Sequence, residues 1–148
     1  SATAVLERYV GPGVWQGLPE SAREHLVGAV TKLSENADSD EVVRLVGQAV
    51  DAYLIHVGET DAGGYTASKL TMGQAADRLE NDGVIVSKQR QLLGYGLALR
   101  NAAEHPDTDP DLNGGRWSIN PKSAQTYLRA LLDTIRSIEG KRSGRFEI

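Results

Sequence analysis

Three residues in the second half of the chain carry the side chains best suited to chemistry. Arg100, Asn101 and His105 lie in the six-residue stretch RNAAEH. Arginine presents a planar fork that matches the oxygens of a phosphate, and histidine exchanges a proton near neutral pH. An RNA 2′-hydroxyl can attack its own phosphate when a base accepts the proton and positive charge stabilises the equatorial oxygens. Arg100 and His105 together therefore suit phosphodiester cleavage, a step that requires no metal ion.

The spacing of Arg100 and His105 leaves two interpretations open. On an ideal helix, five residues put the two side chains about 140° apart around the axis, so they would not meet. Pro106 disfavours helical geometry at His105, and the imidazole can then leave the helix and turn back toward Arg100. An Arg and a His at a helix end also commonly interact with the last carbonyl groups and with the helix dipole. The spacing by itself does not separate a phosphate site from such a helix end.

Two further candidates follow in the polar loop after this stretch. Arg116 and Trp117 could contact a phosphate or a base near His105, because a cation beside an aromatic ring suits such a ligand. Trp117 could instead fold onto the helices as a hydrophobic plug. No metal or cofactor is expected, since the chain has no cysteine and its three histidines lack the spacing of a metal-binding pair.

The composition limits the class of protein. With 148 residues the chain fits one domain, and 40% hydrophobic and 24% charged residues are typical of globular proteins. A net charge of -4 argues against coating of nucleic acid by bulk electrostatics, and 5% aromatic residues argue against a base-stacking platform. No apolar run approaches the roughly 20 residues of a membrane span, and no signal peptide is recognisable. A cytoplasmic protein whose nucleic-acid contacts are local is expected.

Apolar residues recur at spacings of three and four along most of the chain, which predicts amphipathic helices. Ser39 begins one of them as a cap, and Asn120 caps the last, with Pro121 at its first position. Gly140 is predicted to end that last helix. The segment 84–86 is predicted to be a buried turn rather than a strand. The expected helices cover residues 20–36, about 40–58, 69–81, 87–104 and 120–140.

These elements predict an all-α fold, a four-helix up-and-down bundle with an additional short helix. Helices with one apolar stripe bury it most simply against each other. Residues 1–19, with glycines and prolines around Trp15, are interpreted as an N-terminal extension or linker, a short helix and a loop docked through Trp15. Residues 20–140 are expected to form the helical domain, and 141–148 a polar C-terminal tail.

The stretch LALRNAAEHP is followed by a polar loop and then by NPKSAQTYLRALLDTIRSI, and in this it resembles the HEPN superfamily, the higher eukaryotes and prokaryotes nucleotide-binding domain. The signature of that superfamily is an Arg, a polar residue, a few more residues and then a His. Arg100, Asn101 and His105 match these positions. The segment GVIVSKQRQLLGYGLALRNAAEHP is also similar to the C-terminal domain of abortive-infection proteins within the superfamily. The resemblance covers roughly residues 68–138.

The resemblance implies a metal-independent endoribonuclease that acts as a homodimer in a toxin, phage-defence or RNA-processing system. In such dimers the two motifs face each other and form one composite site. Arg100 would bind the scissile phosphate, His105 would act as general acid or base, and Asn101 would orient His105 or the phosphate. The products would carry a 2′,3′-cyclic phosphate and a 5′-hydroxyl. Glycines inside a helix allow a partner helix to approach, so Gly94 and Gly96 are expected at the dimer interface.

A second function stays open, because many members of the superfamily have lost cleavage. The chain could be a non-catalytic HEPN-like module that dimerises or binds nucleotides, and its acidic charge and scarce aromatic residues favour this. The intact Arg, Asn and His favour cleavage. Since the chain starts with Ser-Ala rather than Met, an upstream domain of the same chain is a further expected partner, beside RNA and an antitoxin. No membrane is expected as a partner.

Overall fold

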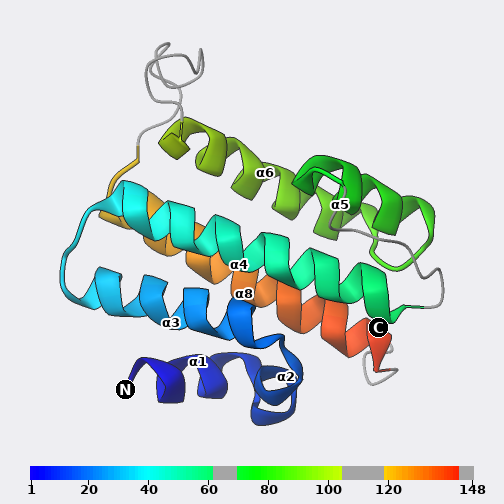
Figure 1. The fold of residues 1–148 in the computed structure, drawn as a ribbon, viewed down its shortest axis with the longest axis horizontal. Helices are drawn as coiled ribbons and strands as arrows, with labels where there is room; N and C mark the ends of the chain where they lie inside the picture. Colours follow the sequence, from blue (N-terminus) through cyan, green and yellow to red (C-terminus); the bar gives the residue numbers. More distant parts are fainter. Residues whose placement is uncertain (62–69, 105–118, 144–148) are drawn as a thin grey trace.

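The computed structural model describes residues 1–61, 70–104 and 119–143, and within these ranges the chain forms seven helices and no strand (Figure 1). The all-α class predicted from the sequence is confirmed. The helices, labelled as in Figure 1, are α1 (Ala2–Val10), α2 (Pro12–Gly17), α3 (Glu20–Ser34), α4 (Ser39–Thr60), α5 (Met72–Asn81), α6 (Ser87–Glu104) and α8 (Pro121–Arg142).

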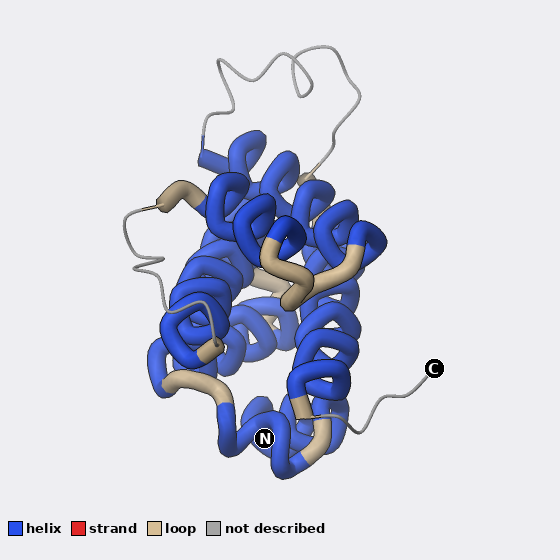
Figure 2. Tube along the Cα trace, turned by 90° about the vertical axis from the view of Figure 1, so that its right-hand side faces the viewer, coloured by secondary structure: helices blue, strands red, loops and turns tan. Residues whose placement is uncertain are grey.

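The four long helices, α3, α4, α6 and α8, lie side by side, and each runs in the opposite direction to the one before it (Figure 1). Helix α4 is central, since it packs against α3, α5, α6 and α8. Helix α5 packs on α4 and α6, whereas α1 packs on α3 and α8 at the other side of the molecule. In the turned view of Figure 2 the N-terminus lies at the bottom of the molecule. None of the helices in the described part of the chain has the length and apolarity that crossing a bilayer requires.

The core is built mainly by α4 and α8. Val42 and Val43 are neighbours on α4 and point about 100° apart, yet both are fully buried, because α4 has other helices on several sides. On α8 the buried apolar residues recur every three or four positions and form one stripe. That stripe consists of Ala124, Tyr127, Leu128, Leu131, Leu132, Ile135 and Ile138.

Residues 1–19 form α1 and α2 and contribute side chains to the same core. Leu6, Val10 and Trp15 are buried and belong to the hydrophobic cluster of the long helices. The predicted docking through Trp15 is confirmed, since that side chain is only 4% exposed. Gly11 has a φ of 96°, a left-handed conformation that favours glycine, and it allows the turn between α1 and α2.

The start of α8 agrees with the sequence prediction, whereas the cap of α4 differs from it by one residue. Asn120 caps α8 and Pro121 occupies its first turn, as predicted. Asp38 caps α4 in place of the expected Ser39, and its carboxylate accepts a hydrogen bond from the Asp40 backbone N–H at 3.0 Å. Ser39 is instead the first helical residue. Both residue types are good caps, and Asp38 is the cap because its backbone is non-helical, with a ψ of 121°.

The last helix does not end at Gly140, so that prediction is wrong. Helix α8 continues to Arg142. Lys141 Nζ donates to the carbonyl oxygens of Gly83 and Val84 at 2.5 and 3.3 Å, and Arg142 pairs with nearby carboxylates. These tertiary contacts outweigh the low helix propensity of one glycine, which costs about 1 kcal/mol.

The segment 84–86 forms a turn and no strand, as predicted. Ile85 is the buried member, at 2% exposure, while Val86 is largely exposed. The Val86 backbone N–H donates to the Gln89 side chain at 2.8 Å, which satisfies a donor at the start of α6. The turn thereby fixes where α6 begins, and α6 carries Arg100 at its far end.

Candidate functional site

Arg100 lies near the described end of α6, and its side chain crosses to α4. Its guanidinium Nη1 donates to Asp51 Oδ2 at 3.0 Å. The Arg100 side chain is 23% exposed and that of Asp51 is 41% exposed. The ion pair therefore lies at the surface of the groove between two helices, where a carboxylate fixes the orientation of the guanidinium.

Gly47 makes this placement possible. A Cβ atom at position 47 would lie 2.6 Å from Arg100 Cδ and 2.9 Å from Cγ, closer than side chains tolerate. Gly47 and Asp51 are four residues apart, so they lie on the same face of α4. The hydrocarbon part of Arg100 can consequently rest on the bare backbone at Gly47 while its guanidinium reaches Asp51 one turn further along.

Tyr127 of α8 lies close to the same ion pair and has an unusual environment. Its side chain is 3% exposed, and among the described residues its hydroxyl has no hydrogen-bond partner. Burial raises the pKa of Tyr127 far above its usual value; the Arg100 charge lowers this pKa and the Asp51 charge raises it further. A buried, unpaired hydroxyl carries a desolvation cost, so the structure places an unused polar group beside the motif.

Gly96 has a role different from the predicted one. A Cβ atom at position 96 would overlap the ring of Tyr127, and Gly96 is itself buried. The glycine thus allows α8 of the same chain to approach, and it is not available for a partner subunit. Gly94 is half-buried, with the Arg90 guanidinium above it. The expectation of a dimer interface at Gly96 is corrected by this contact within the chain.

A cavity of about 560 Å³ opens beside Arg100, between α4, α5 and α6. Its size is in the range of pockets that hold small ligands, about 300–1,000 Å³. Asp51, Arg100 and Asn101 provide charged and amide groups in its wall. The apolar part of the wall consists of Leu54, Ile55, Leu70, Met72, Ala75 and Leu97.

The first turn of α5 forms another part of the cavity wall, through Thr71, Met72 and Gly73. Thr71 caps the helix in a reciprocal capping box with Gln74, so α5 begins at Met72 rather than at the predicted residue 69. The first N–H groups of a helix lack acceptors within the helix and attract anions. The start of α5 and the Arg100 guanidinium therefore place positive potential around a cavity whose wall also carries the Asp51 carboxylate.

Of the predicted site residues, the structure brings Arg100 and Asn101 to the same cavity. His105, Arg116 and Trp117 lie outside the described residues, and His105 is the residue directly after the end of α6 at Glu104. In the described ranges, no three His, Asp or Glu side chains gather in a group that could hold a metal ion.

Sequence reasoning missed Asp51, Gly47 and Tyr127. Gly47 and Asp51 carry a weak local signal, a glycine four residues before an acid inside an amphipathic helix. Tyr127 looks like an ordinary member of the α8 apolar stripe. Their meeting with Arg100 depends on how three helices pack, which no local pattern specifies.

Tyr53 and Tyr127, the two tyrosines buried in the described part of the chain, are expected to respond oppositely to removal of the hydroxyl. Tyr127→Phe should leave the free energy of unfolding unchanged or raise it by about 1 kcal/mol, since its hydroxyl has no described partner. Tyr53→Phe should lower it by about 1.5–3 kcal/mol, because the Tyr53 hydroxyl donates to the Glu139 carboxylate at 2.6 Å. Urea unfolding followed by circular dichroism measures both values.

The loss of stability at alkaline pH provides a second measurement on Tyr53 and Tyr127. Burial raises the pKa of both Tyr53 and Tyr127, so above pH about 10 the unfolded chain loses protons that the folded chain keeps. The stability that these two raised pKa values contribute is fully present below about pH 10 and is lost as the pH rises. Each Phe variant should therefore lose less stability than the wild type as the pH rises above about 10. If the two variants lose equal amounts of unfolding free energy at neutral pH, the Tyr127 hydroxyl has a hydrogen-bond partner.

Comparison with protein-family models, with curated proteins and with solved structures finds no match to this chain.

Proposed function

We propose that this protein is a metal-independent endoribonuclease of the HEPN type, with Arg100 as the residue that binds the scissile phosphate. One observation carries this assignment. Arg100 and Asn101, two of the three motif residues, share the wall of a cavity of about 560 Å³ with the first turn of α5. A helix end that served only its own dipole would need no such cavity beside it.

The cavity offers complementary surfaces to the parts of a nucleotide. A phosphate at its mouth would meet the Arg100 guanidinium and the N-terminal end of α5, which both favour an anion. Asn101 can donate to and accept from a base or a ribose hydroxyl. The apolar side chains of α4, α5 and α6 would cover the faces of the nucleoside.

Cleavage would proceed by attack of the 2′-oxygen on the adjacent phosphorus. His105 would accept the 2′-hydroxyl proton, or donate a proton to the departing 5′-oxygen, and Arg100 would stabilise the charge on the equatorial oxygens. The new bond closes a 2′,3′-cyclic phosphate, and the broken bond frees a 5′-hydroxyl. A homodimer would supply one His105 for each of the two proton transfers.

Asp51 would hold Arg100 ready for the phosphate. A flexible arginine loses conformational entropy when it binds a ligand, and a carboxylate that fixes the guanidinium beforehand reduces that loss. The 3.0 Å ion pair across Gly47 has this geometry. Asp51 is therefore proposed as a positioning residue rather than as a group that takes part in the reaction.

The wider setting is proposed on the same basis. The alternating long helices would be the up-and-down bundle of a HEPN domain, which dimerises so that the two motifs form one site. A cytoplasmic place in a toxin or phage-defence system, with an antitoxin or an upstream domain as partner, would give such an enzyme access to cellular RNA.

A second candidate function is a non-catalytic module that binds nucleotides. It is favoured by the Asp51 carboxylate, which neutralises Arg100 and competes with a phosphate for it. Such a module would bind a ribonucleotide in the cavity without cleaving RNA. Nucleotide binding that is abolished by Arg100→Gln, in a dimer without nuclease activity, would select this function.

The first experiment is incubation of the protein in EDTA with an RNA of mixed sequence and with a DNA of the same sequence. We expect the RNA to be cut to products with a 2′,3′-cyclic phosphate, because the attacking group is the 2′-hydroxyl. The DNA should stay intact, since it lacks that hydroxyl. Loss of activity in EDTA, cleavage of the DNA, or intact RNA with a confirmed dimer would each contradict the proposed reaction.

Gly47→Ala is expected to reduce RNA cleavage about tenfold while the fold remains intact. The new methyl group displaces the flexible Arg100 stem from α4, and alanine favours a helix over glycine by about 1 kcal/mol. Cleavage rates and urea unfolding measured on the same preparation separate the two effects. Gly28→Ala is the matched control, since its added Cβ would make only an ordinary contact of 3.5 Å with Leu45. Equal cleavage by both variants would contradict the role given to Gly47.

A further inference from the structure

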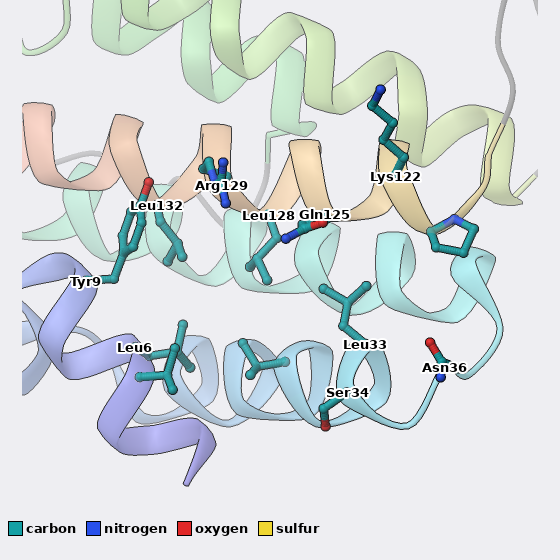
Figure 3. A pocket seen from close by; sticks show the side chains of 13 residues that line it. Leu6, Tyr9, Leu33, Ser34, Asn36, Lys122, Gln125, Leu128, Arg129 and Leu132 are labelled. Atoms are coloured by element: carbon teal, nitrogen blue, oxygen red, sulfur yellow. The ribbon is translucent and has the colours of Figure 1, made fainter.

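A second cavity, of about 550 Å³, lies between α1, α3 and α8, away from the Arg100 site (Figure 3). Its floor is aliphatic, and Leu6, Leu33, Leu128 and Leu132 converge on it from all three helices (Figure 3). Val5 lies at its edge and is 48% exposed, a large fraction for an apolar side chain. The bundle therefore leaves an apolar groove open where α1 meets α3 and α8.

The charged residues that line this groove have one sign. They are Lys122 and Arg129, both on α8, and none of the described residues that line it is acidic although the chain has a net charge of -4. Neither cation forms an ion pair with another described residue. In Figure 3 both residues lie on α8 at one side of the leucines, and the Lys122 side chain extends away from them. Long basic side chains can keep their stems on apolar surface while the charge stays in water.

The polar groups at the end of the groove near α1 are already used. The Tyr9 hydroxyl donates to Asp133 Oδ1 at 2.8 Å, which ties α1 to α8. Asp133 does not line the groove, whereas Arg129 does. An aliphatic floor below a cationic edge matches a molecule that has an apolar chain and an anionic head.

We propose that this groove binds a single-chain amphiphilic anion, with the alkyl chain over the leucines and the carboxylate at the Arg129 and Lys122 edge. A volume of about 550 Å³ fits a small ligand rather than a second protein domain. The binding site is independent of the RNA chemistry, so either can fail without the other.

The test is calorimetric titration of the whole protein with octanoate, decanoate and dodecanoate below their micelle concentrations. Affinity should rise with chain length, by up to about fourfold for each added CH₂ group that is buried. The uncharged decanol should bind more weakly than decanoate, and decyltrimethylammonium should not bind. Amide NMR shifts should move in α1, α3 and α8.

Two pairs of variants separate the charge from the apolar floor. Lys122→Gln with Arg129→Gln should weaken decanoate about fivefold and leave decanol unchanged, since each exposed charge contributes little. Arg78→Gln with Lys88→Gln removes two exposed charges from α5 and α6 and should change neither ligand. Gln125→Trp places a ring in the groove and should weaken both ligands at least tenfold, whereas Thr126→Trp, which does not line the groove, should not.

Several results would overturn this assignment. One is an affinity that does not depend on chain length, and another is equal binding of decanoate and decyltrimethylammonium. Unchanged binding by Gln125→Trp would place the ligand elsewhere. A rise in molecular mass with protein concentration, lost in Gln125→Trp, would show that a second copy of this chain occupies the groove instead.

Discussion

Arg100→Gln is expected to lower the rate of RNA cleavage by about 10²- to 10³-fold. Arg100 would be a principal source of positive charge on the phosphate, and removing one such donor from a transition state commonly has an effect of this size. Single-turnover rates at saturating RNA measure the chemical step, and the same assay at low RNA measures binding. A loss in both would show that Arg100 contacts the phosphate before and during reaction.

Arg90→Gln is the matched control for this prediction. Arg90 lies on the same helix, its side chain is also 23% exposed, and it forms a comparable ion pair, with Asp77 at 2.6 Å. Both variants should lose similar, small amounts of stability, up to about 1 kcal/mol. Only Arg100→Gln should lose cleavage. Equal cleavage rates in the two variants would remove Arg100 from the site.

His105→Ala completes the same experiment, with an expected loss of about 10²- to 10⁴-fold for a group that transfers a proton. A mixture of Arg100→Gln and His105→Ala chains tests the composite site. In a mixed dimer one chain lacks Arg100 and the other lacks His105. Cleavage that persists undiminished in both single variants would mean that the nuclease site lies elsewhere on the chain.

Glu139→Ala is expected to reduce the free energy of unfolding by about 2–4 kcal/mol. The Glu139 carboxylate accepts from the Tyr53 hydroxyl and from Arg142 Nη1, each at 2.6 Å. Arg142 also donates to Thr60 and Asp61, so this cluster ties the end of α4 to the end of α8. Burial lowers the pKa of Arg142, but hydrogen bonding and the charge of Glu139 outweigh this and raise it.

Removing the Glu139 carboxylate would leave a largely buried guanidinium and a fully buried hydroxyl without their main partner, which is the costly way to break such a cluster. Glu41→Ala is the control, because Glu41 forms a 3.3 Å pair with Arg44 in which both side chains are about two-fifths exposed. It should cost at most about 1 kcal/mol. Urea unfolding compares the two, and equal costs would show that the cluster at Glu139 adds nothing to the fold.

The helices and their main boundaries could be predicted because their signals are local. An apolar residue every three or four positions specifies a helix wherever it occurs, and Asn120 followed by Pro121 marks a start through its own backbone. Gly140 failed as a stop signal because Lys141 and Arg142 find partners on distant segments. The low helix propensity of Gly140 costs about 1 kcal/mol, and the tertiary contacts of Lys141 and Arg142 contribute more than this.

The sequence by itself determined that the chain is helical and that Arg100 and Asn101 belong to a helix, since periodicity is a property of neighbouring residues. Only the tertiary structure decided what surrounds Arg100. Asp51 lies 49 positions earlier in the chain, yet it meets the guanidinium at 3.0 Å because α4 and α6 pack closely at Gly47. Gly96, locally indistinguishable from an interface glycine, instead admits Tyr127 of the same chain. Contacts between distant helices depend on how whole surfaces fit together, and that information is in no single stretch of residues.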